Sequence, residues 1–120
     1  MKVSYIELAG EKHPMCFSLS ATEDIIETFG SVDAMSDAVT GGDLLTQLRA
    51  VDKTLEILLR AGRAYCTAMG EQLPAPLRCR PADLIDVTSG EAVRAIFETM
   101  RHDSAREVET ASKNAEPTQA

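Results

Sequence analysis

The side chains best suited to chemistry in this sequence are two histidines, three cysteines and several pairs of carboxylates. His13 and Cys16 lie three residues apart in a segment that alternates like a β-strand, so their side chains should point to opposite faces. A zinc site needs three or four converging ligands, and this pair does not provide them. His102 has no potential partner near it in the sequence and is expected to be solvated. The spacing therefore predicts no bound metal ion and no cofactor.

Carboxylates one helical turn apart form a second candidate site. Glu23 and Glu27 have this spacing, and so do Asp33 and Asp37. Such pairs can act as acid and base or hold a divalent cation. Nothing else in the sequence converges on either pair, and acidic residues are favoured near helix N-termini by the helix dipole. We therefore expect both pairs of carboxylates to lie on solvated faces of their helices.

Two loops share features with reactive segments. The Gly-rich stretch Thr40–Asp43 lacks the Lys-Ser/Thr pair and the preceding buried strand of a phosphate-binding loop, so it predicts a helix break followed by an N-cap. Cys79 lies between Arg78 and Arg80, and neighbouring cations can activate a thiol. No nucleophile motif surrounds Cys79, and no spacing supports a Ser–His–Asp set. We therefore expect a protein that is not an enzyme.

Length and composition predict one folded domain, since the chain has 120 residues and 44% of them are hydrophobic. No run approaches the roughly 18 apolar residues of a membrane-spanning helix, and the N-terminus lacks the features of a signal peptide. Three cysteines without a close pair predict reduced thiols, as in the cytoplasm.

The net charge of −7 is unevenly distributed, with −5 over residues 1–40 and +2 over residues 41–80. General binding to nucleic acid or to a membrane needs an exposed basic face, so neither is expected. The acidic front and basic middle allow complementary contacts between copies, which leaves a homo-oligomer open.

Hydrophobic periodicity predicts a β-hairpin followed by helices. Residues 2–8 and 13–19 alternate as strands around a turn at Ala9–Lys12. The helices expected next cover residues 21–29 with Ser20 as N-cap, 31–39, 44–69, 81–87, and a last helix capped by Thr88. The predicted fold class is α+β, mostly α, with an N-terminal antiparallel β-hairpin packed on a bundle of about five helices.

The same pattern divides the chain into two parts. Residues 1–103 are expected to form a single hairpin-plus-helical domain. Residues 104–120 contain little that can be buried, so they predict a polar, disordered C-terminal tail.

The longest predicted helix carries two apolar stripes at helical spacing. The first stripe consists of Leu44, Leu48, Val51, Leu55, Leu58, Leu59, Gly62, Cys66 and Met69. The second stripe consists of Ala50, Ile57, Ala61, Ala64 and Ala68. A small bundle can cover only one stripe well, and small residues allow close approach of another helix. The second stripe is therefore predicted to be the partner-binding face.

The order of these elements resembles the tail assembly chaperones of long-tailed phages and prophages. The resemblance covers about residues 1–103, and the segments that carry it are Glu11–Phe17, Ala21–Gly30 and Pro81–Val87. It implies a non-enzymatic protein in the cytoplasm of a bacterial host cell, which binds the tape-measure protein before the tail tube polymerises. It also implies a longer frameshifted product in many members, to which a polar tail would be a suitable junction.

A small regulator of the helix-turn-helix type, binding DNA or another protein, is the alternative. Its basic face would consist of Arg49, Lys53, Arg60 and Arg63 on the longest helix. The net charge of −7 opposes this hypothesis. A tape-measure gene downstream would favour the chaperone.

Overall fold

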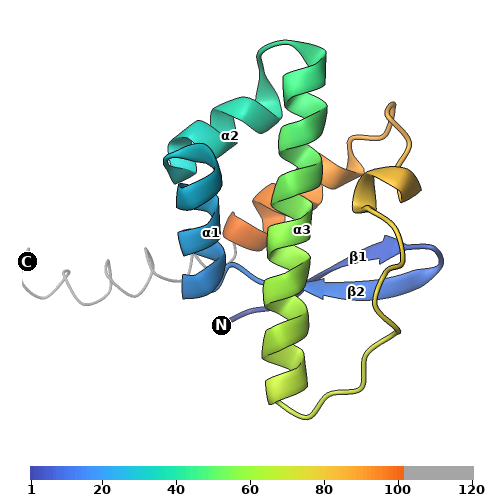
Figure 1. Ribbon diagram of the computed structural model, residues 1–120. Helices are drawn as coiled ribbons and strands as arrows, with labels where there is room; N and C mark the ends of the chain where they lie inside the picture. Colours follow the sequence, from blue (N-terminus) through green and yellow to red (C-terminus); the bar gives the residue numbers. More distant parts are fainter. Residues whose placement is uncertain (102–120) are drawn as a thin grey trace, which may run out of the picture.

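The computed structural model describes residues 1–101, in which a β-hairpin packs beside helices (Figure 1). The elements are β1 (Ser4–Leu8), β2 (Glu11–Met15), α1 (Leu19–Phe29), α2 (Val32–Thr40), α3 (Leu44–Ala68) and the 3₁₀ helix η1 (Pro81–Leu84). A last helix begins at residue 91 and continues to residue 101. The prediction of about five helices is wrong, because residues 1–101 contain four α-helices.

The missing helix is the one predicted over residues 81–87, which forms only the short η1. After η1, the carboxylate of Asp86 accepts hydrogen bonds from the backbone N–H and the hydroxyl of Thr88, both at 2.8 Å. These bonds lower the pKa of Asp86 and turn the chain away from a helical path. Thr88 is thus used in this turn, and Ser89 accepts the hydrogen bond from the backbone of Glu91 instead.

The hairpin closes with a tighter turn than predicted. Leu8 pairs directly with Glu11, so the turn contains only Ala9 and Gly10 rather than Ala9–Lys12. Ala9 and Gly10 have φ of 53° and 80°. Positive φ at both central residues is the requirement of the two-residue turns that match strand twist.

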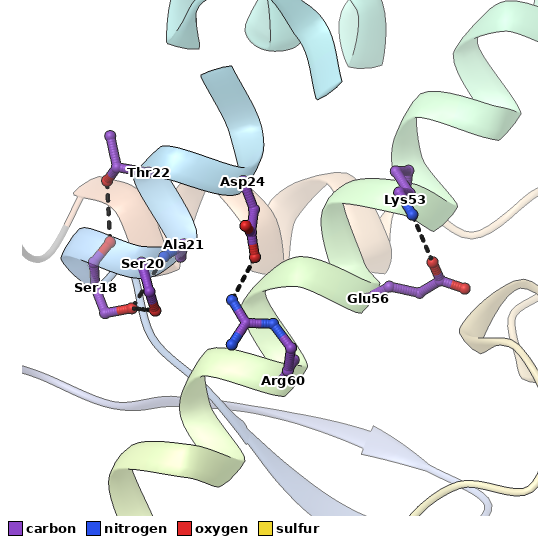
Figure 2. Close-up of polar contacts among 8 residues, drawn as sticks. All are labelled: Ser18, Ser20, Ala21, Thr22, Asp24, Lys53, Glu56 and Arg60. Atoms are coloured by element: carbon purple, nitrogen blue, oxygen red, sulfur yellow. Dashed lines mark hydrogen bonds and ion pairs between the residues drawn. The ribbon is translucent and has the colours of Figure 1, made fainter. Parts of the chain in front are cut away.

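Side-chain caps start the three long helices. The side-chain oxygens of Ser18, Ser31 and Asp43 accept hydrogen bonds from the backbone N–H three residues further on, at 3.1, 2.9 and 3.1 Å. Ser18 therefore replaces the predicted cap Ser20, as Figure 2 shows. The second strand ends early, at Met15, which leaves room for α1 to begin at residue 19.

Helix α3 is the central element and contacts β2, α1, α2 and η1. The backbone N–H of Cys16 donates a hydrogen bond of 3.3 Å to the carbonyl of Leu58, which fastens the end of β2 to α3. The largest completely buried side chains come from all parts of the fold: Leu8, Met15, Ile25, Met35, Leu55, Leu58 and Ile96. None of the helices within residues 1–101 is long and apolar enough to cross a membrane.

Candidate functional site

The residues predicted to be poor candidates for chemistry are dispersed. His13 in β2 and Cys16, directly after β2, are both buried. The acidic pairs of α1 and α2 remain exposed: Glu23, Glu27, Asp33 and Asp37. Within residues 1–101, no group of three or more His, Cys, Asp or Glu residues is placed to hold a metal ion. His102 and the predicted tail, residues 104–120, lie outside the described residues.

The predicted partner-binding stripe is divided by the fold. Ala50, Ile57 and Ala61 are buried in the core of the chain itself, whereas Ala64 and Ala68 are exposed. The prediction is therefore wrong for the three buried residues, which no partner can reach without unfolding. The physical reason is that small residues allow close approach equally well to neighbours in the same chain, and α3 is surrounded by such neighbours.

The first apolar stripe is exposed where α3 begins. Leu44, Leu45 and Leu48 are 63%, 55% and 42% exposed, and we call these three residues the leucine patch. Two residues of the patch belong to the stripe that periodicity marks as the more apolar one, while Leu45 lies beside it. The patch adjoins the turn between α2 and α3, at the end of α3 remote from the loop that follows it (Figure 1).

A sequence signal for this exposure exists in the preceding turn. Gly41 and Gly42 separate α2 from α3, so the first turns of α3 form a corner of the molecule. Residues at a corner have fewer neighbours than residues in the middle of a helix. Hydrophobic periodicity alone does not distinguish the two positions.

The basic side chains of α3 are largely engaged within the fold. Arg60 forms an ion pair with Asp24 of α1, and Figure 2 shows its guanidinium reaching across to that carboxylate. Lys53 lies 3.7 Å from Glu56. Arg63 donates a hydrogen bond of 2.8 Å to the carbonyl of Pro74. These contacts orient the cations along α3 and the loop that follows it.

That loop and α3 enclose a groove with a volume of about 520 Å³. Its lining comes from β2, from α3 and from residues 76–81. The lining residues are His13, Pro14, Glu56, Leu59, Arg60, Arg63, Pro76, Leu77, Arg78, Cys79, Arg80 and Pro81. Four of these side chains are arginines and one is a carboxylate. We call this site the arginine groove. The sequence marks Arg78 and Arg80 as cations that flank Cys79, but it does not predict that they share a groove with residues of β2.

η1 is fixed against α3 by a polar contact at one end of this groove. The carboxylate of Asp52 accepts a hydrogen bond of 2.9 Å from the backbone N–H of Ala82 and lies 3.7 Å from Arg80. Asp52 is mostly buried, so its contacts hold the loop in place.

The thiols differ in their surroundings. Cys79 is exposed in the arginine groove, whereas Cys16 and Cys66 are buried and not bonded to each other. Burial raises the pKa of the Cys66 thiol to about 11, and a hydrogen bond with Glu71 and its negative charge add to the effect. Cys66 therefore stays protonated and unreactive at neutral pH.

Compared with known proteins, the chain matches no protein family, no curated protein and no solved structure.

Proposed function

We propose that this protein is a non-enzymatic tail assembly chaperone, which binds the tape-measure protein of a phage or prophage in the bacterial cytoplasm. The observation that supports the proposal is the leucine patch. It presents Leu44, Leu45 and Leu48 at a corner of α3, outside the core. Resemblance in the order of the elements suggests the type of client.

Clustered apolar side chains on a helix are suited to holding another helix. Isolated exposed leucines are common on protein surfaces, but contiguous ones mark interaction sites. Complete burial of one leucine contributes roughly 1.5–3 kcal/mol, so three together can supply a substantial part of a binding free energy. A long, helical and aggregation-prone client offers apolar ridges that fit such a patch.

The alternative, a DNA-binding regulator, has one structural feature in its favour. A three-residue turn that contains Gly41 and Gly42 joins α2 to α3, as in helix-turn-helix proteins. Against it, α3 contacts four other elements, which leaves little of its length free to enter a major groove. Arg60 and Arg63 are also engaged with other groups of the protein.

Co-expression with a tape-measure protein from the same genome tests the proposal. The double variant Leu45→Glu/Leu48→Glu should stay folded, because both positions are exposed, and should lose at least tenfold in affinity for the client. Leu19→Glu is the matched control, since Leu19 is 82% exposed but lies on α1, away from the patch. Circular dichroism checks that all variants are folded.

The absence of a complex between the wild-type protein and the tape-measure protein would overturn this function. Equal binding by the wild type and the leucine-patch variant would overturn the assignment of the leucine patch as the contact.

A further inference from the structure

We propose that the arginine groove binds a small organic anion, with an oxyanion head group held by guanidinium groups and an apolar body held by the groove wall. The groove is separate from the leucine patch, so this inference does not depend on the proposed chaperone function. Three properties of the lining residues support it: charge, shape and an unpaired buried polar atom.

The charge of the lining is opposite to that of the chain. Arg60, Arg63, Arg78 and Arg80 line the groove together with one carboxylate, Glu56, in a protein whose net charge is −7. Outside the lining, Asp24 pairs with Arg60, and Asp52 lies 3.7 Å from Arg80. Glu56 itself lies 3.7 Å from Lys53, which offsets its charge. Arg63 and Arg78 have no carboxylate partner among residues 1–101, so the groove keeps a local positive potential that attracts anions.

The arginines retain hydrogen-bond donors for a ligand. A guanidinium has five N–H groups in a planar fork, which matches the oxygens of a carboxylate or phosphate. Arg63 donates one of them to Pro74, and Arg80 is 3.7 Å from Asp52. Arg78 forms no hydrogen bond or ion pair with any residue in the described part of the chain, so its whole fork is free there.

The rest of the lining is apolar and defines the body of the ligand. Pro14, Leu59 and Leu77 contribute carbon surface between the charged groups. The volume of about 520 Å³ falls within the range of sites that hold small molecules. An inorganic ion would leave this surface exposed to water, so a ligand with both an anionic and an apolar part fits better.

His13 supplies an independent indication of binding. It lines the groove, the residue is 4% exposed, and its Nε2 atom has no hydrogen-bond partner among residues 1–101. Buried polar atoms in proteins are nearly always paired. An oxyanion seated in the groove can accept a hydrogen bond from an Nε2–H group at this position.

Binding of a fluorescent organic anion tests the proposal directly. The probe is 1-anilinonaphthalene-8-sulfonate, and its neutral analogue N-phenyl-1-naphthylamine is the ligand control. Arg78→Gln should weaken binding of the anionic probe at least fivefold and leave binding of the neutral analogue unchanged, because Arg78 is exposed and has no hydrogen bond or ion pair to lose within residues 1–101. Arg49→Gln, at an exposed position of α3 outside the groove, should change neither.

Amide chemical shifts then locate the probe. Binding in the groove should shift the signals of His13, Leu77 and Cys79, and the Leu45→Glu/Leu48→Glu variant should bind the probe like the wild type. Equal affinity of Arg78→Gln and the wild type, or shifts confined to the leucine patch, would overturn the proposal.

Competition with the fluorescent probe distinguishes a small organic anion from an acidic segment of a protein. Phenyl phosphate or benzoate should displace the probe from the wild-type protein at millimolar concentration. Displacement by a glutamate-rich decapeptide and not by these small anions would contradict the proposal, since the occupant would then be an acidic segment of a protein. Unchanged binding of Arg78→Gln to the tape-measure protein would show that the two sites are independent.

Discussion

The backbone of Gly62 in α3 lies directly against the backbone of Pro14 in β2. A Cβ atom at residue 62 would lie 2.3 Å from the carbonyl oxygen of Pro14 and 2.6 Å from the Cα atom of Met15. No other residue type fits this position without moving the hairpin away from the helix. Since Pro14 also lines the arginine groove, the same contact sets the position of one groove wall.

Gly62→Ala should therefore destabilise the protein. In an unconstrained helix, alanine is more favourable than glycine by about 1 kcal/mol. Here the added methyl group overlaps backbone atoms, and we expect a net loss of about 1–3 kcal/mol in the free energy of unfolding. Urea denaturation measures this loss. Gly90→Ala is the control, because nothing lies within 4 Å of its added Cβ atom; equal stability of the two variants would contradict the close contact.

Two buried threonines should respond in opposite ways to replacement by valine. The hydroxyl of Thr99 donates a hydrogen bond of 2.8 Å to the carbonyl of Ala95, whereas the hydroxyl of Thr54 has no partner among the described residues. Thr99→Val should cost about 0.5–1.5 kcal/mol, and Thr54→Val should be neutral or stabilising. Thermal denaturation of the two variants makes the comparison; a larger loss for Thr54→Val would mean that its hydroxyl is hydrogen-bonded after all.

Local signals allowed much of this fold to be predicted from the sequence. Ser31 and Asp43 begin α2 and α3 as expected, because a side-chain oxygen before an apolar repeat satisfies the free N–H groups of the first turn. Gly30, with a φ of 98°, ends α1 as expected. These features depend on a few neighbouring residues, and the sequence contains all of them.

The predictions that the structure corrects concern features that depend on tertiary contacts. Ser18 and Ser20 are both suitable caps, and the choice of Ser18 follows from where β2 ends against α3. Periodicity places Ile57 and Leu48 on apolar stripes, but their burial depends on which neighbours cover them. The arginine groove combines residues of β2, α3 and a loop, and no local pattern predicts that combination.

The ion pair between Asp24 and Arg60 should contribute little to stability. It links α1 to α3, but both side chains are substantially exposed to solvent. Exposed pairs contribute about 0.2–1 kcal/mol, and salt weakens them further. A double-mutant cycle with Asp24→Asn and Arg60→Gln measures the coupling. A value near 3 kcal/mol that persists in 1 M salt would show that the pair is a major link between the helices.

Stability should fall at alkaline pH because of Cys66. Its pKa is about 11 in the folded protein, compared with 9.0 for an unperturbed thiol. A raised pKa means that the folded state holds the proton more tightly than the unfolded state. The stabilisation is therefore complete below pH 9 and is lost as the pH rises through 11, by an amount on the order of 2–3 kcal/mol.

Urea denaturation at intervals between pH 8 and 11 measures this slope, with Cys66→Ala and Cys79→Ala as a matched pair. Cys66→Ala should flatten the slope, because the buried ionisable group is gone, although the cavity that it leaves lowers stability at neutral pH. Cys79→Ala removes an exposed thiol and should keep the wild-type slope. Tyr5, whose pKa is also raised by burial and by the charges of Cys66 and Glu71, leaves a smaller residual slope that Tyr5→Phe removes. A wild-type slope in Cys66→Ala would assign the alkaline loss of stability to other groups.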